Sequence, residues 1–276
     1  MTQLPEVEVT RKDLEREIVG KRIKEVTVKG AGLVARHRNR PDFYKALEGR
    51  KIEGILRRGT VLVLQLDDGH VLVCKLGANA TLSRETATEE PAKDTQFVAV
   101  FTTGGALHYH APAKDGELFV IPADELAELP EFAPGGIDPL ADQFTWPAFS
   151  RQLTGRRKML KAVMTDESFM VGLGDLYADE ILWAAGLSGS RESHTLSAQE
   201  VRRLYRAVLE VLYEAVKQGG TAEVSEGDPE EEMGDFGDHI KVFQREGLPC
   251  ARCRQPIFHD QIARGLSSYH CKQCQS

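Results

Sequence analysis

Four of the five cysteines in this chain lie in two CxxC pairs near its carboxyl end. Cys250 and Cys253 form CARC, and after 17 intervening residues Cys271 and Cys274 form CKQC. Each pair brings two thiolates onto one ion from a tight turn, so the pairs together offer tetrahedral coordination by four sulfur atoms at about 2.3 Å. No ligand position is left for water. The spacing therefore predicts one Zn²⁺ per chain, with a structural rather than a catalytic role.

The segment between the two pairs, RQPIFHDQIARGLSSYH, has short alternating runs on either side of Gly265. This pattern predicts a β-hairpin that the metal closes at its base. Disulfides or idle thiols are the alternative, but a cytosolic chain keeps its thiols reduced and coincidental pairing at this spacing is improbable. Cys74 lies in the apolar run HVLVCKL and is expected to be a buried strand residue.

The composition indicates a folded chain of more than one part. A length of 276 residues with 41% hydrophobic content suffices for two domains, or for one domain with an appendage. No apolar run approaches the roughly 18 to 20 residues of a membrane span. Glu6, Glu8 and Arg11 stand where a signal peptide has its apolar segment. We therefore expect a soluble, cytoplasmic monomer with no membrane partner.

The charge is unevenly distributed along the chain. A formal net charge of −7 argues by itself against a nucleic-acid partner, since non-specific DNA affinity comes mainly from Lys and Arg at phosphates. However, many of the acidic residues lie in one segment, residues 221–238, whereas RRG at Arg57–Gly59, RQLTGRRKMLK and ARCRQ are locally basic. This distribution leaves room for a basic face.

The first half of the chain reads as a β domain. Short β-branched segments separated by DDG, TGG or KDG turns predict an antiparallel β domain over roughly residues 20–122. The predicted strands lie in KRIKEVTVKG, KIEGILRRG, TVLVLQLDDGHVLVCKLG, QFVAVFTTGGALHYH and GELFVIP. Before them, PEVEVTRKDLEREIVGK has Val9, Leu14 and Ile18 at helical spacing, which predicts an N-terminal helix ending near Gly20.

After a Pro- and Gly-rich hinge, LPEFAPGGIDPL, the apolar period becomes helical from about Trp146 to Gly220. Gly172-Leu173-Gly174 stands between two of the predicted helices. Such a turn can present backbone N–H groups at a helix N-terminus, where a phosphate oxygen fits. On the turn alone, a tight helix-to-helix connection explains the glycines more simply.

Three stretches together resemble the formamidopyrimidine-DNA glycosylase and endonuclease VIII family: the opening LPEVE, the segment MVGLGDLYADEILWAAGL, and the four-cysteine ending CKQCQ. The resemblance implies an α+β multidomain protein that binds damaged or abasic DNA and flips a base out of the duplex. It implies an N-terminal antiparallel β-sandwich in residues 1–130, a helix–two-turn–helix domain in residues 131–240, and a zinc-finger β-hairpin in residues 241–276.

The same resemblance assigns the chemistry to the amino terminus. In the family the initiator Met is removed, and the exposed residue, usually proline, attacks C1′ of the damaged nucleotide to form a Schiff base. Here Thr2 takes that place, and its free α-amine can form an imine. The glutamate that follows in the family is replaced by Gln3, a neutral amide that cannot shuttle a proton, so Glu6 is the candidate substitute.

Other family positions have also changed. The lysine after Arg-Arg-Gly corresponds to Thr60, next to Arg58. The void-filling methionine corresponds to Ala78, and the Asp-Pro-Arg-Arg-Phe-Gly loop corresponds to Ala111–Gly116, with Lys114 and an Asp115 in the wedge position. The predicted DNA-binding positions are Arg58, Thr60, Lys114, Lys161, Gly172, Gly174, Asp175 and Arg264. Lys161 keeps the family lysine, Asp175 replaces an asparagine, and Arg264 compensates for Leu266 in place of the finger arginine.

Three functions follow from this mixture of retained and altered positions. The first is a DNA glycosylase or abasic-site lyase of base excision repair that acts through the Thr2 amine, with weak or lost activity on the usual lesions. The second is a paralogue that recognises damaged DNA without cutting it, which Gln3, Thr60, Asp115 and Leu266 favour. The third is a zinc-stabilised scaffold for a protein partner, suggested by the acidic segment and Asp175.

Overall fold

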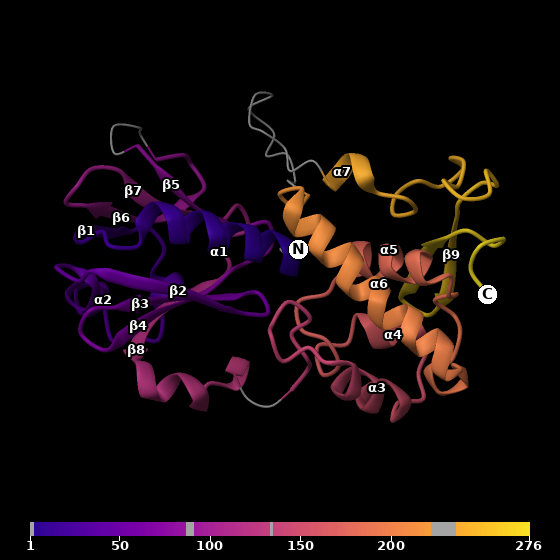
Figure 1. The fold of residues 1–276 in the computed structure, drawn as a ribbon. Coiled ribbons are helices and arrows are strands. Elements are labelled where there is room, and N and C mark those ends of the chain that lie inside the picture. Colours follow the sequence, from indigo (N-terminus) through magenta and orange to yellow (C-terminus); the bar gives the residue numbers. More distant parts are fainter. Residues whose placement is uncertain (1–2, 87–90, 133–134, 222–235) are drawn as a thin grey trace. The chain divides into compact units, whose positions relative to one another are not determined.

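The computed structural model describes residues 3–86, 91–132, 135–221 and 236–276. The chain forms two compact units, Met1–Pro134 and Gly135–Ser276 (Figure 1). Each unit has its own core, and each is described by itself. The helical segment and the cysteine-rich end of the chain both belong to the second unit.

The first unit is built from two antiparallel four-stranded sheets, which confirms the predicted antiparallel β domain. One sheet has the order β1-β6-β7-β5, and the other has the order β2-β3-β4-β8. The strands are β1 (Ile23–Val28), β2 (Ile52–Arg58), β3 (Val61–Leu66), β4 (His70–Lys75), β5 (Thr81–Glu85), β6 (Thr95–Phe101), β7 (Ala106–His110) and β8 (Glu117–Pro122). The sequence analysis did not identify β5, which is the edge strand next to β7.

The main core of this unit contains residues from both sheets, including Leu62 and Leu64 of β3 and Phe97 of β6. A second cluster forms around Val63 of β3 and Phe119 of β8, and it packs against two short 3-10 helices. Those are η2 (Ala123–Glu128) and η3 (Pro130–Phe132). Because β3 and β4 contribute to both clusters, their sequences are nearly continuous apolar runs rather than alternating ones.

The predicted N-terminal helix is confirmed as α1 (Leu4–Ile18), which contacts β2, β3 and β5. Leu4, Val7, Leu14 and Ile18 form its buried face. Two further helices in this unit are the 3-10 turn η1 (Ala31–Val34) and α2 (Arg40–Leu47). The sequence analysis did not predict α2. Asn39, just before this helix, caps it by accepting a hydrogen bond from the Asp42 backbone N–H at 2.9 Å.

The second unit is helical, with a β-hairpin close to its end. Its elements are α3 (Trp146–Thr154), α4 (Leu160–Met164), α5 (Asp175–Ala185), η4 (Ser193–Thr195), α6 (Ala198–Lys217), α7 (Phe236–His239), β9 (Phe258–Ala263) and β10 (Leu266–His270). Ser197 and Glu200 form a capping box at the start of α6. In the part of the chain that the structure describes, no helix has the length and apolar character needed to cross a bilayer.

Candidate functional site

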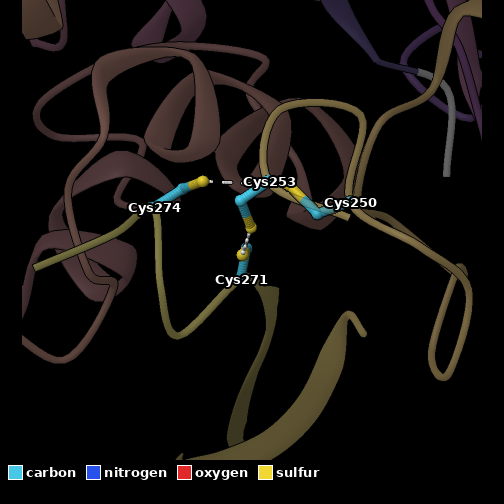
Figure 2. Close-up of side chains that lie close together, drawn as sticks. All are labelled: Cys250, Cys253, Cys271 and Cys274. Atoms are coloured by element: carbon cyan, nitrogen blue, oxygen red, sulfur yellow. Dashed lines mark hydrogen bonds between the residues drawn. The ribbon is translucent and has the colours of Figure 1, made fainter. Parts of the chain in front are cut away.

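The four cysteines of the two CxxC pairs converge at one end of the β9–β10 hairpin (Figure 2). Their sulfur atoms all lie within 4.8 Å of one another. Cys253 Sγ is 3.3 Å from Cys271 Sγ, and Cys250 Sγ is 3.9 Å from Cys274 Sγ. Four sulfur atoms held at about 2.3 Å from one tetrahedral ion would be about 3.8 Å apart. The cluster therefore has the dimensions of a four-thiolate metal site, and all four thiols are free of disulfides.

The pKa shifts of these thiols are also those expected of a site that binds a cation. Burial raises the pKa of Cys274 to about 12 and raises the pKa of Cys271, with the neighbouring thiols adding to both effects. Burial acts in the same direction on Cys250, but the backbone N–H groups of Cys253 and Arg252 outweigh it and lower the pKa to about 6. The Cys250 thiolate therefore forms readily, whereas Cys271 and Cys274 resist a further negative charge beside it. A divalent cation would remove that repulsion.

The cysteine cluster is anchored to α5 by contacts that the spacing of the cysteines did not reveal. Arg252, inside the first CxxC pair, donates hydrogen bonds to the carbonyls of Trp183 and Ala184 at 2.7 and 2.9 Å. Its guanidinium also lies 4.0 Å from the centre of the Trp183 ring. Gln275 accepts a hydrogen bond from the Cys271 backbone N–H at 2.9 Å. The finger is therefore part of the core of the second unit.

The predicted catalytic residues lie at the start of α1. Thr2 is outside the described residues. Gln3 is the residue before the helix, and its carbonyl accepts a hydrogen bond from the Val7 N–H at 3.2 Å. Glu6 lies half-buried in the first turn of α1. Leu4, which follows Gln3, is completely buried and fixes the beginning of the helix against the core.

A buried ion pair fixes the same helix to the second sheet. Arg57 of β2, whose side chain is only 4% exposed, lies 2.7 Å from a carboxylate oxygen of Glu8, and Arg11 contacts that carboxylate from the next turn. Burial tends to raise the pKa of Glu8, but the hydrogen bonds from Arg11 and Arg57 outweigh it and hold the pKa below its usual range. The sequence showed Glu8 and Arg57 only in separate motifs, because the two residues are 49 positions apart.

Two predicted DNA-binding positions, Arg58 and Thr60, lie just after Arg57 in the chain. Arg58 is the last residue of β2, and Thr60 is in the turn before β3; both are half-buried. Between them Gly59 adopts a φ of 53°, and its carbonyl accepts a hydrogen bond from Arg57 at 3.0 Å. The turn that carries Arg58 and Thr60 is therefore held by the same guanidinium that holds α1.

The loop after β7 folds back onto the turn after β4. Asp115 accepts a hydrogen bond from the backbone N–H of Ala78 at 2.9 Å. Tyr109 links the same segments, since its hydroxyl accepts from the Gly77 N–H at 3.0 Å and donates to the Asp115 carbonyl at 3.1 Å. Lys114 is exposed, with a φ of 53°. The structure thus brings together the two positions that the sequence analysis assigned to void filling and to wedging.

In the second unit, Lys161 lies against the start of α5 with its side chain completely buried. Its ammonium group is 2.9 Å from the carboxylate of Asp179 and 3.1 Å from that of Asp175, and it also donates to the Asp175 carbonyl at 2.8 Å. Asp175, by contrast, is 70% exposed at the first turn of α5. Lys161 therefore holds the first turn of α5 from inside the unit.

A side-chain carboxylate is hydrogen-bonded to the backbone of the Gly172–Gly174 turn. Glu167 accepts a hydrogen bond from the Gly172 N–H, at 3.1 and 3.2 Å to its two oxygens. Gly172 has a φ of 72°, in the left-handed region that favours glycine, so it serves the tight connection that the sequence analysis weighed against phosphate binding. The arrangement shows that this N–H faces an anionic group.

The finger hairpin presents one exposed cation at its tip. Arg264 lies between β9 and β10 next to Gly265, whose φ is 71°. Leu266 is half-buried at the start of β10. The predicted hairpin is thereby confirmed, and Arg264 is the basic residue at its turn.

Buried acidic residues of α5 were missed by the sequence analysis. Asp179 accepts hydrogen bonds from the Ser268 hydroxyl at 2.7 Å and the Tyr269 N–H at 3.0 Å. Glu180 accepts from three consecutive backbone N–H groups, of residues 241, 242 and 243, at 2.8 to 2.9 Å. Two adjacent charged residues inside an otherwise apolar helix, DLYADEILWAAGL, were the available signal.

Two family descriptions match the chain over most of its length. The formamidopyrimidine-DNA glycosylase N-terminal domain matches residues 1–118, and the formamidopyrimidine-DNA glycosylase H2TH domain matches residues 136–226. The first match lies within the β-sheet unit and carries α1 with the Glu8–Arg57 pair. The second lies within the helical unit and carries Lys161 and the glycine turn.

Named relatives and solved structures agree with these matches. The formamidopyrimidine-DNA glycosylase of Thermus thermophilus is 35% identical, covering 100% of this chain and 98% of the relative, and that of Desulfitobacterium hafniense is 31% identical over the whole of both. A crystal structure of the Thermus thermophilus protein matches with a TM-score of 0.83 over 99% of this chain and 98% of that one. The Lactococcus lactis enzyme in complex with abasic-site DNA matches with a TM-score of 0.88 and 26% identity, over 99% of both chains. This chain therefore belongs to the formamidopyrimidine-DNA glycosylase family.

Proposed function

We propose that this protein is a DNA glycosylase of base excision repair that binds damaged or abasic DNA as a monomer. The single observation that carries the proposal is the match, over nearly the whole of both chains, to a Lactococcus lactis enzyme whose structure holds DNA with an abasic site. The three predicted segments, residues 1–130, 131–240 and 241–276, would then supply the reactive amine, the helical DNA contacts and the finger.

The nucleophile in this proposal is the α-amine of Thr2 after removal of Met1. An amine with a pKa near 8 is partly unprotonated at neutral pH, whereas an ordinary lysine is almost wholly charged. Support comes from the anchoring of the helix that follows, through buried Leu4 and the Glu8–Arg57 pair. A nucleophile gains most from rigid support of this kind. Glu6, in the first helical turn, is the proposed acid–base group beside the neutral Gln3.

The finger is proposed to hold one structural Zn²⁺ through Cys250, Cys253, Cys271 and Cys274. The sulfur atoms have the spacing of a four-thiolate set. Four thiolates fill the tetrahedral coordination of Zn²⁺ and leave no position for water, which supports a closed, structural site. The ion would fix the base of the hairpin, so that Arg264 at the turn can contact a DNA phosphate.

The remaining proposed DNA contacts are of two kinds. Exposed Lys114 and half-buried Arg58 would contact phosphates directly, and the turn with Gly172 and Gly174 would offer a backbone N–H once the Glu167 carboxylate moves away. Lys161 would act indirectly, because its ammonium group is buried against Asp175 and Asp179. Exposed Asp175 opposes phosphate binding, and Thr60 adds no charge.

The altered void-filling and wedge positions limit which lesions the protein can process. Filling the space of a flipped base offsets a few kcal/mol of unstacking, and Ala78 and Asp115 are poorly suited to that task. We therefore propose weak activity on an 8-oxoguanine duplex and better activity on abasic or already opened DNA. Efficient turnover of 8-oxoguanine in duplex DNA would contradict this part of the proposal.

A second function, recognition of damaged DNA without cleavage, is favoured by one specific observation. Asp115 is hydrogen-bonded to Ala78 and so closes the loop that would otherwise enter the duplex. Damage recognition is tested by fluorescence anisotropy on two matched duplexes, one with an abasic-site analogue and one intact. Both the enzyme and the binding module should prefer the abasic duplex by about tenfold or more, which is about 1.4 kcal/mol. Equal affinity for both duplexes would contradict damage recognition.

A charge-matched variant sharpens the binding test. Arg264→Ala should weaken binding to both duplexes and reduce its salt dependence by about one counterion, because a phosphate contact carries no sequence information. Arg16→Ala is the control: Arg16 is 75% exposed on α1 and pairs with Asp13, outside the predicted DNA-binding positions. An unchanged salt dependence in Arg264→Ala would exclude this arginine from the DNA interface.

A further inference from the structure

Two histidines and a glutamate converge on one face of the first sheet, at its β5 edge. His108 and His110 are two positions apart on β7, so their side chains leave the strand on the same face, while Tyr109 between them enters the core. β5 lies beside β7 (Figure 1). The two strands pair with Ser83 opposite His108, which places Glu85 on the same face as the two histidines. The cysteine cluster is in the other unit.

The donor atoms of these three residues point at one another. Glu85 Oε2 is 2.8 Å from His108 Nδ1, and Glu85 Oε1 is 2.5 Å from His110 Nε2. No pair of the three donor atoms is more than 4.8 Å apart. The His108 side chain is 2% exposed, but Glu85 is 25% exposed, so solvent reaches the cluster from the carboxylate side. The three donors therefore form a compact group with an entry path.

This spacing suits a small divalent ion. Imidazole nitrogen and carboxylate oxygen bind Zn²⁺ at about 2.0 to 2.2 Å, so neighbouring ligands of a tetrahedral ion lie about 3.4 Å apart. Each nitrogen–oxygen distance would need to lengthen by less than about 1 Å for an ion to enter between them. Two imidazoles and one carboxylate are a frequent ligand set for divalent transition metals, which leaves a fourth position for water.

The outer contacts of the cluster orient its donors as they would around a metal. His110 Nδ1 lies 3.0 Å from the hydroxyl of Thr95, a completely buried residue, so the ring is held with Nε2 toward Glu85. Asp94 is 3.6 Å from the same Nδ1. The Ser83 hydroxyl donates to the Glu85 carboxylate at 3.0 Å. Metal-binding histidines are commonly fixed in this way through their second nitrogen.

We propose that Glu85, His108 and His110 bind a divalent transition-metal ion such as Zn²⁺, at a site separate from the four-cysteine finger. The ion would be held by His108 Nδ1, His110 Nε2 and the Glu85 carboxylate, with water in the open position. It would tie edge strand β5 to β7. Since Tyr109, between the two histidines, holds both Gly77 and Asp115, the ion would also steady the loop Ala111–Gly116 that follows β7.

The experiment is equilibrium dialysis of the whole protein against buffered micromolar Zn²⁺, followed by metal analysis. The finger is expected to keep its ion through a prior wash with a mild chelator, because four thiolates enclose it, whereas the ion at Glu85 exchanges through its open side. The wild-type protein should hold one Zn²⁺ per chain after the wash and two after dialysis. One Zn²⁺ after dialysis would overturn the proposal.

Three variants locate the second ion. Glu85→Gln and His110→Asn should each hold one Zn²⁺ after dialysis, and circular dichroism together with the retained finger ion checks that they fold. The matched control is His70→Asn, because His70 on β4 also has a carboxylate neighbour, Asp68 at 3.1 Å, but lies outside the cluster. That variant should hold two. Two ions in Glu85→Gln or His110→Asn would place the second site elsewhere and overturn the proposal.

An optical test uses Co²⁺ on protein whose finger is already filled with zinc. Cobalt at Glu85, His108 and His110 should give the visible bands of a nitrogen–oxygen site without a thiolate-to-cobalt charge-transfer band, and Glu85→Gln should abolish them. A thiolate band instead would assign the added metal to the cysteines and contradict the proposal. These measurements use no DNA, so their failure leaves the proposed repair function untouched.

Discussion

The carboxylate of Asp115 and the backbone N–H of Ala78 are joined by a hydrogen bond of 2.9 Å. Gly77 makes this approach possible, since a Cβ atom there would stand 2.0 Å from an Asp115 carboxylate oxygen. Ala78 and Asp115 are 37 positions apart in the sequence, yet they close one loop pair in the first unit. The altered residues of the two family loops therefore fit each other, and the loops are braced before any DNA is present.

The first prediction concerns this loop contact. Asp115→Ala should remove the acceptor and speed amide hydrogen exchange at Ala78 about fivefold, which corresponds to about 1 kcal/mol for one exposed hydrogen bond. Asp115→Asn keeps a side-chain oxygen and should give a smaller increase. Mass spectrometry of peptides that contain Ala78 measures the rates. An exchange rate in Asp115→Ala equal to that of wild type would show that the contact does not hold the loop in solution.

The second prediction concerns the ion pair that anchors α1. Arg57→Met should lower the free energy of unfolding of the first unit by about 2 kcal/mol, because the carboxylate of Glu8 loses one of its two arginine partners. Urea unfolding followed by circular dichroism measures the change. Asp13→Asn is the control, since its partner Arg16 is 75% exposed, and it should cost less than about 0.5 kcal/mol. Equal effects of the two variants would contradict the buried pair.

The same pair predicts a pH dependence. The pKa of Glu8 is lowered in the folded state, so its ion pair stabilises the fold above the unfolded value of about 4.3 and loses that effect as pH falls through the lower folded value. The stability difference between wild type and Glu8→Gln should therefore be largest at neutral pH and shrink below about pH 4. A difference that grows on acidification would contradict this sign.

The third prediction concerns the buried ammonium group of Lys161. Lys161→Met would leave the Asp179 carboxylate buried without its cation, which should cost about 3 kcal/mol or more in the second unit. Lys158→Met is the matched control, because Lys158 is 58% exposed beside Asp166, and its loss should cost less than about 1 kcal/mol. Urea unfolding followed by tryptophan fluorescence reports this unit, which contains Trp146 and Trp183.

The fourth prediction concerns the finger. Cys250→Ser should release the finger zinc and expose the β9–β10 hairpin to proteolysis, while the first unit keeps its β-sheet circular dichroism, because metal binding and folding are coupled in small metal domains. The hairpin is also held by Arg252 and Gln275, so partial protection of α5 should remain. Freshly purified protein without zinc would refute the metal assignment.

Local patterns carried most of what the sequence predicted. The finger was predictable because the ligands and the turn glycine Gly265 lie within one short segment. The N-terminal helix was predictable because its apolar period is regular, and the strands of the second sheet were predictable because they are short β-branched runs bounded by turn residues. In contrast, β5 is an edge strand with a single buried residue, Leu82, so its sequence has no clear alternation of apolar and polar residues. It is recognised as a strand only through its pairing with β7. Helix α2 buries only Phe43 and Leu47, too few for a clear helical period.

Contacts between distant residues were not predictable from those patterns. Glu180 lies in a recognisable helix, but its partners are backbone N–H groups about 60 positions later. His108 and His110 read as ordinary strand residues until β5 brings Glu85 beside them. The sequence placed Asp115 at the wedge position of the family loop, and the fold adds its hydrogen bond to the backbone of Ala78. Distance in sequence, rather than residue type, separates the predicted features from the missed ones.

The most direct test of the proposed repair function is borohydride trapping on DNA with an abasic site, because reduction of a Schiff base records an amine nucleophile as a covalent adduct. The protein with its native terminus should give an adduct, a tag that blocks the Thr2 amine should abolish it, and Gln3→Glu should raise the yield by restoring a titratable group beside the imine. Adduct formation that is unaffected by blocking the terminus, or the absence of any adduct in all three proteins, would contradict the account.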